Sequence, residues 1–196
     1  MTELATSAFD DFELEPWKNG GGTTRELLRH PEVGELAWRV SLASIESDGA
    51  FSRFDGLDRS FVPISGAPFT LLHGDACPAA PQAPGRVHRF DGEWPTEAAG
   101  IQGRVEALNV LTRRGQWRAT IEWLVQRPGR FALESEHSIL LVFDGSITAR
   151  VSGEDEPLAL EARTALWLHE PDRGDELVLE APDPEFRAAL IELRSV

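Results

Sequence analysis

Short stretches in which apolar and polar residues alternate dominate the pattern of this chain. In residues 117–125, WRATIEWLV, nearly every second residue is apolar, which predicts a half-buried strand. In residues 38–45, WRVSLASI, the same period of two separates an apolar face from a face carrying Arg39, Ser41 and Ala43. The second face is expected to point small polar groups into a cavity.

The remaining apolar stretches are short and are separated by Pro, Gly and Asp. Further strands are expected at 23–29, 61–64, 69–73, 86–90, 103–113, 138–143, 146–151, 162–169, 176–180 and 186–193. No long helical period is present, so the pattern predicts an all-β sandwich or barrel.

Turn residues add three local expectations. Pro63 places its strand at a sheet edge or at a bulge. Asp144-Gly145 predicts a hairpin between the strands on either side of it. The run ACPAAPQAPG at 76–85 is expected to be an ordered loop or a connector.

Charge and composition exclude several classes of protein. The net charge of −14 disfavours nucleic acid as a partner, because such binding relies on clustered Lys and Arg. There is no apolar run of membrane-spanning length, and the first residues lack the features of a signal peptide, so a cytoplasmic protein is expected. Cys77 is the single cysteine, which excludes an internal disulfide and a paired-thiol metal site.

Common catalytic and cofactor motifs are missing. The five histidines show no His-x-His or His-x-x-x-His spacing: His30, His73, His88, His137 and His169. We therefore expect no metal and no cofactor. Lys18 precedes the glycine run of residues 20–22, whereas a phosphate-binding P-loop needs its Lys after the glycines. No Gly-x-Ser-x-Gly nucleophile motif is present.

The stretch PWKNGGGTTRE at 16–26 is the main candidate for ligand binding. Three glycines allow the backbone to approach a ligand closely, and their N–H groups could form a nest for a carboxylate. The nest and its neighbours would comprise Lys18, Asn19, Gly20, Gly21, Gly22 and Thr23. Trp17 could stack on a flat ligand or cover the core, and both readings stay open.

Arg59 is the second candidate, because the planar guanidinium fork suits a carboxylate. A structural ion pair with a buried Asp or Glu is the alternative. Phe51 is expected to flank the flat part of a ligand, and Ser41 to supply a hydroxyl. Lys18, Arg25, Arg39, Arg53 and Arg59 make this region locally basic within an acidic chain.

The same stretches carry a family resemblance. PWKNGGGTTREL and WRVSLASIESDGAFSRFDGLDR, followed by FDGEWP at 90–95 and ALNVLTRR at 107–114, resemble the HutD/Ves family of bacterial double-cupin proteins. Asn109 matches the Asn of the family pattern DFNVMxRR, and it is therefore a further candidate ligand-binding residue. Ala107 and Leu111 depart from the Asp and Met of that pattern, which puts an inherited acid or base function at this strand in doubt.

The resemblance implies a fold and a domain organisation. The expected fold is a double-stranded β-helix, with two cupin-like jelly rolls packed together as a bicupin. The N-terminal barrel, residues 1–114, would hold the pocket motifs, and residues 115–196 would form the second barrel.

The resemblance also implies a role in histidine utilisation. We hypothesise non-catalytic binding of a small anionic metabolite, such as urocanate or a formylglutamate-like compound. One alternative is a metal-free isomerase or hydrolase with Glu26 or Glu46 as general base. Another is a protein-interaction module with a vestigial pocket. A homodimer is possible if the strand containing Pro63 leaves an unpaired edge.

Overall fold

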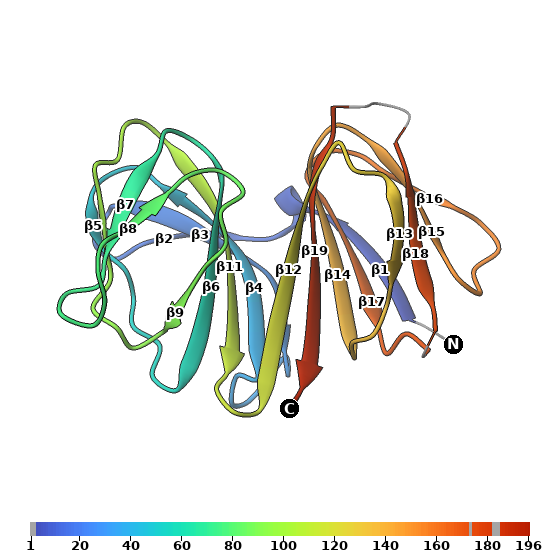
Figure 1. The fold of residues 1–196 in the computed structure, drawn as a ribbon, viewed down its shortest axis with the longest axis horizontal. Coiled ribbons are helices and arrows are strands. Elements are labelled where there is room, and N and C mark those ends of the chain that lie inside the picture. Colours follow the sequence, from blue (N-terminus) through green and yellow to red (C-terminus); the bar gives the residue numbers. More distant parts are fainter. Residues whose placement is uncertain (1–2, 173, 182–184) are drawn as a thin grey trace. The chain divides into compact units, whose positions relative to one another are not determined.

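The computed structural model describes residues 3–172, 174–181 and 185–196. This part of the chain contains strands β1–β19 and one short 3-10 turn, η1 (Phe9–Asp11), as Figure 1 shows. The all-β class predicted from the alternation is confirmed. Within the same residues, no helix has the length and apolar character needed to cross a membrane.

The chain divides into two compact units. The N-terminal unit is Phe12–Arg118, and the C-terminal unit combines Met1–Asp11 with Ala119–Val196. The sequence placed the first eleven residues in the N-terminal barrel, and this part of the division is corrected. The cause is strand pairing, because β1 (Glu3–Ala8) runs antiparallel to β17 (Thr164–His169) along its whole length.

Two antiparallel sheets make up the N-terminal unit. The six-stranded sheet has the order β2-β3-β4-β11-β6-β9. Its strands are β2 (Leu14–Pro16), β3 (Gly22–His30), β4 (Trp38–Ile45), β11 (Val105–Arg113), β6 (Leu57–Ser65) and β9 (His88–Asp91). The four-stranded sheet has the order β5-β10-β7-β8. Its strands are β5 (Gly49–Ala50), β10 (Glu97–Ala99), β7 (Phe69–Leu72) and β8 (Ala80–Gln82).

The C-terminal unit also has two antiparallel sheets. One has the order β1-β17-β14-β19-β12 and the other β13-β18-β15-β16. Their further strands are β12 (Trp117–Val125), β13 (Gly129–Ala132), β14 (His137–Asp144), β15 (Ile147–Val151), β16 (Leu158–Leu160), β18 (Glu176–Glu180) and β19 (Arg187–Ser195).

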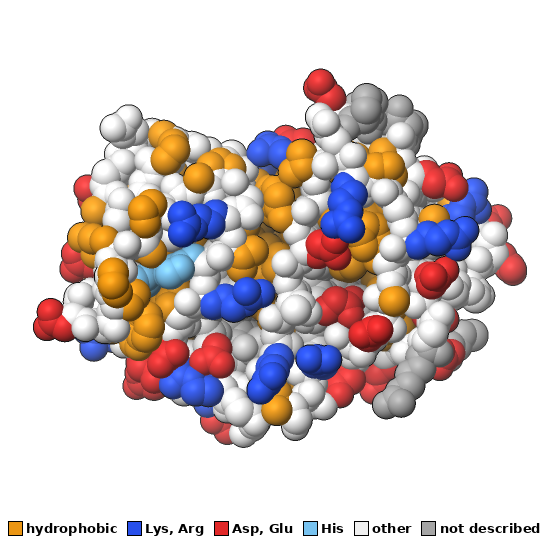
Figure 2. Space-filling view, viewed as in Figure 1, with side chains coloured by type: hydrophobic (Ala, Val, Ile, Leu, Met, Phe, Trp, Pro, Cys, Tyr) orange, Lys and Arg blue, Asp and Glu red, His pale blue; other side chains and the backbone are white. Residues whose placement is uncertain are grey.

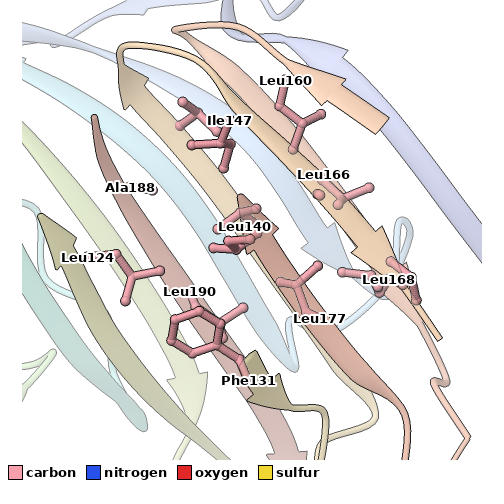
Figure 3. Packing of buried hydrophobic residues seen from close by; sticks show 14 of the residues in the cluster. Leu124, Phe131, Leu140, Ile147, Leu160, Leu166, Leu168, Leu177, Ala188 and Leu190 are labelled. Carbon is pink, nitrogen blue, oxygen red and sulfur yellow. The ribbon is translucent and has the colours of Figure 1, made fainter. Parts of the chain in front are cut away.

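Each unit has its own hydrophobic core. In the C-terminal unit a leucine-rich cluster from both sheets fills the interior, with Leu140, Leu166 and Leu177 fully buried, as seen in Figure 3. In the N-terminal unit the core cluster is aromatic and includes Phe61, Phe69 and Phe90. Several rings of this cluster, those of Phe51, Phe61 and Phe90, lie close to Arg59 in the candidate site described below.

The hairpin predicted at Asp144-Gly145 is wrong. β14 pairs with β17 and β19, whereas β15 pairs with β16 and β18, so the turn carries the chain from one sheet to the other. Residues 137–143 of β14 are all buried. Both edges of β14 are already paired, with β17 and β19, so β15 cannot pair beside it.

Two other turn expectations change in the structure. Pro63 lies on β6, an interior strand of the order β11-β6-β9, and the register of β6 against β11 shifts opposite it. The bulge reading is therefore confirmed. β6 as a whole is an interior strand, but its ladder with β9 covers only Asp58–Phe61 and ends before Pro63. The proline-rich run at 76–85 contains a short strand, β8, which pairs with β7.

Candidate functional site

A polar cavity of about 480 Å³ opens in the N-terminal unit. Its walls come from strands of the six-stranded sheet and from the loops near residues 15–19 and 50–54. The lining residues are Glu15, Pro16, Trp17, Lys18, Asn19, Thr24, Arg39, Ser41, Ala43, Ala50, Phe51, Ser52, Phe54, Arg59 and Asn109.

The alternation of β4 positions one wall of this cavity. Arg39, Ser41 and Ala43 all line it, whereas Trp38 and Val40 are fully buried on the opposite face. Asn109 on β11 lies directly opposite Ser41 in the ladder. The polar face of β4 is therefore the one that the period of two predicted for 38–45. The ladder adds Asn109, which is far from β4 in the sequence.

Arg59 lies at the centre of the site and is almost completely buried, with 7% of its surface exposed. Its Nε and Nη2 donate hydrogen bonds to Asn109 Oδ1 at 2.9 and 2.5 Å. Because guanidinium is a donor only, the oxygen of the Asn109 amide must face it. The guanidinium carbon lies 4.6 Å from the centre of the Phe51 ring and 5.6 Å from that of Phe90.

Arg59 forms no ion pair with any carboxylate of the described residues. The alternative prediction, an ion pair with a buried Asp or Glu, is therefore wrong. Burial, and after it the positive charge of Arg39, lowers the pKa of Arg59 to about 9. A buried guanidinium held by one amide oxygen and aromatic faces remains poorly compensated. An anion entering the cavity would supply the missing negative charge.

Arg39 adds a second guanidinium to the cavity. It forms an ion pair with Glu26 at 3.6 Å and lies 5.0 Å from the centre of the Phe54 ring. Burial is the main cause of its lowered pKa, and Glu26 partly opposes that effect. The sequence reading counted Arg39 in the basic enrichment but missed it as a site residue, although its position next to Ser41 on the polar face of β4 was a usable signal.

Trp17 covers one side of the cavity. Its indole Nε1 donates a hydrogen bond to Thr24 Oγ1 at 2.7 Å, and its ring meets Phe51 edge-on, with centroids 6.0 Å apart. Trp17 also packs against the aromatic core cluster. The core-covering role of Trp17 is therefore confirmed. The indole also lines the cavity, and its stacking on a flat ligand stays a prediction.

The glycine run does not form the expected anion nest. Gly20, Gly21, Gly22 and Thr23 are absent from the cavity lining. Both N–H groups donate hydrogen bonds within the loop, that of Gly20 to Trp17 O and that of Gly21 to Asn19 Oδ1, each at 3.0 Å. Asn19 Nδ2 in turn donates to Ala50 O at 3.2 Å, so this stretch fixes two loops of the cavity rim.

The two carboxylates proposed as general bases also lie outside the cavity lining. Glu26 is engaged by Arg39 and by Arg29, the latter at 3.9 Å, and Glu46 is exposed. The carboxylate that does line the cavity is Glu15, which the sequence reading missed, together with Thr24, Ser52 and Phe54. No cluster of three or more potential metal ligands occurs among residues 3–172, 174–181 and 185–196.

Comparisons of sequence relate this chain to known proteins. The family model described as HutD matches residues 9–186. An uncharacterized 21.2 kDa protein in the hutC 3' region of Pseudomonas putida is 32% identical over 154 residues, which cover 78% of this chain and 79% of that protein. Protein Ves of Cronobacter sakazakii is 35% identical over 106 residues, or 54% of this chain and 58% of that protein.

Solved structures show the same architecture. The structure of HutD from Pseudomonas fluorescens SBW25, determined in a formate condition, has a TM-score of 0.82 and 25% identity and covers 99% of this chain and 100% of that one. Oxalate decarboxylase from Bacillus subtilis, a cupin, has a TM-score of 0.66 at 10% identity, and the match covers 97% of this chain and 79% of that one. The latter likeness shows the fold alone, and the predicted cupin-like β fold is confirmed.

Proposed function

The chain belongs to the HutD family, and on that premise we propose that it binds a small carboxylate metabolite without transforming it and thereby modulates histidine catabolism. The observation that carries this proposal is Arg59, a buried cation that has an amide but no described carboxylate as its partner. Burying a charge in this way is unfavourable until a counter-charge arrives.

The cavity suits a ligand of that class. Its volume of about 480 Å³ is at the lower end of the usual range for small-molecule sites. Arg39 and Arg59 favour a carboxylate, and the rings of Trp17, Phe51 and Phe54 can flank a flat group. Urocanate and N-formylglutamate combine a carboxylate with a planar imidazole, alkene or amide, and a relative from a hut region supports a link to this pathway.

Calorimetric titration with urocanate and with N-formyl-L-glutamate, followed by product analysis of the same samples, tests the proposal. We expect saturable binding in the micromolar range, because two or three charge-assisted hydrogen bonds each contribute roughly 1.5–3 kcal/mol. We also expect the ligand to be recovered unchanged. Turnover would replace the binding function with an enzymatic one, and no binding of either compound would remove the proposal.

Glu15 gives a prediction about selectivity. Its carboxylate is exposed, lines the cavity, and repels a second negative charge on a ligand. Replacing Glu15 by Gln is expected to tighten binding of the dianion N-formyl-L-glutamate by about threefold, the size of an exposed charge interaction. Urocanate, with one carboxylate, should gain less. Glu13→Gln, an exposed neighbour outside the lining, is the control and should change neither affinity.

A further inference from the structure

A pair of histidines lies in the N-terminal unit outside the cavity lining. His73 follows β7 and His88 begins β9, and their Nε2 atoms are 2.8 Å apart. His73 is 1% exposed, whereas His88 is partly exposed. Histidine side chains reach the surface over the part of the unit that carries β8 and β9 in Figure 1, as Figure 2 shows. Protons from solvent can therefore reach the pair.

The hydrogen bonds around the pair favour one arrangement of its protons. Thr96 Oγ1 lies 3.3 Å from Trp94 O and 2.9 Å from His73 Nδ1. With its hydroxyl donated to Trp94 O, Thr96 accepts a hydrogen bond from His73 Nδ1–H. His73 Nε2 then carries no proton, and it accepts a hydrogen bond from His88 Nε2–H. A further proton can be added at Nδ1 of His88 without breaking any of these bonds.

The ring of Phe90 connects this pair to the binding site. The guanidinium carbon of Arg59 lies 5.6 Å from the centre of the Phe90 ring, and the His73 ring centroid lies 4.7 Å from that centre. Arg59 and both histidines thus lie close to the same aromatic ring, in a largely buried setting that screens charge poorly. The charge of Arg59, and of a ligand bound to it, therefore affects how readily the histidines are protonated.

We infer that the site takes up a proton as it binds its anion, and that the His73–His88 pair is where this proton goes. The inference rests on the proposed function, because it concerns regulation of the same site. Anion binding at Arg59 cancels the positive charge that disfavours a second cation nearby. Ligand affinity then rises as the pH falls, since proton binding and anion binding assist each other.

Charged groups around the pair agree with this direction. The pKa of His73 is lowered by burial, then by the charges of His88 and Arg59, and the pKa of His88 by burial and then by Arg86. Two carboxylates close in the chain, Asp91 and Glu93, are engaged by Arg114. Asp75 lies in the exposed turn after His73. The contribution from Arg59 is the one that a ligand can remove.

Calorimetry of the full chain with N-formyl-L-glutamate between pH 5.5 and 8 tests the inference, because its carboxyl groups stay ionised over this range. We expect binding about three- to tenfold tighter at pH 5.5 than at pH 8. Near pH 6 the heat should differ between two buffers of different ionisation enthalpy, which reports proton uptake. His88→Gln should abolish this uptake and flatten the pH dependence, with affinity at pH 8 unchanged.

His169→Gln is the matched control, because His169 forms a similar contact with His137 in the C-terminal unit, at 2.9 Å between Nδ1 atoms. Its pH dependence should equal that of the wild type. Binding without proton uptake would overturn the inference and leave the proposed function intact.

NMR titration of the imidazoles in the unliganded protein gives a second test. Arg59→Met should raise the apparent pKa of the His73–His88 pair relative to the wild type, and identical titrations would overturn the inference. If N-formyl-L-glutamate gives no binding at any pH, the proposed function fails for this ligand. The imidazole titration then still shows whether the charge of Arg59 acts on the pair, so the two failures can be told apart.

Discussion

Replacing Arg59 by Met is expected to weaken binding of a small carboxylate by at least about 100-fold, because two charge-assisted hydrogen bonds of roughly 1.5–3 kcal/mol each are lost. Methionine keeps the length and much of the apolar contact with Phe51 and Phe90. Arg59→Lys keeps the charge but not the fork, and its affinity should lie between those of the wild type and Arg59→Met. Titration calorimetry measures all three.

A second readout separates binding from folding in these variants. Removing a buried charge without a described carboxylate partner relieves a desolvation cost, whereas Asn109 Oδ1 loses the donors it now accepts from. These effects oppose each other. The free energy of unfolding of Arg59→Met, measured in denaturant, should therefore lie within about 2 kcal/mol of the wild-type value. Arg104→Met, at an exposed arginine paired with Glu106, is the control for loss of charge. Unchanged affinity in Arg59→Met would remove Arg59 from the site.

The wall of the cavity could be predicted from the sequence because strand geometry is local. A period of two fixes which residues of 38–45 share a face, and Arg39, Ser41 and Ala43 do line the cavity. Asn109 was identified in another way, from its match to the family pattern. The ladder with β4 places it opposite Ser41.

The partners of a strand are not encoded in the same way. Asp144-Gly145 has the residues of a hairpin turn, yet β14 and β15 pair with different strands. The pairing of β1 with β17 joins segments about 160 residues apart. The contact between His73 and His88 likewise depends on β7 and β9 belonging to different sheets of one unit. Such choices are made by the packing of whole sheets, and periodicity cannot reveal them.

The glycine run shows a related limit. The sequence marked 20–22 as a place of close backbone approach, but it expected a ligand there. In the structure the neighbour is the protein itself, since a Cβ on Gly22 would lie 2.1 Å from the carbonyl oxygen of Ser44 and 3.2 Å from the Trp17 ring. Gly22 is therefore needed for close packing at this point, and the N–H groups of Gly20 and Gly21 are used within the loop.

Gly22→Ala is therefore expected to destabilise the protein by about 3 kcal/mol or more, because the clash involves backbone that cannot turn aside. β3 would have to move away from β4, and Trp17, whose N–H donates to Gly22 O at 2.9 Å, would move with it. Loss of stability should thus be accompanied by weaker ligand binding. Denaturant unfolding and calorimetry on the same samples measure the two effects.

Gly49→Ala is the matched control for this substitution. Gly49 is also a strand glycine of the N-terminal unit, but a Cβ there would meet its nearest neighbour, Asn19 Nδ2, at an ordinary contact distance of 3.7 Å. Its stability should stay within about 1 kcal/mol of the wild type, since alanine also restricts the unfolded chain. Equal stabilities for Gly22→Ala and Gly49→Ala would show that β3 and β4 yield at this point, and that the close approach is not what requires glycine.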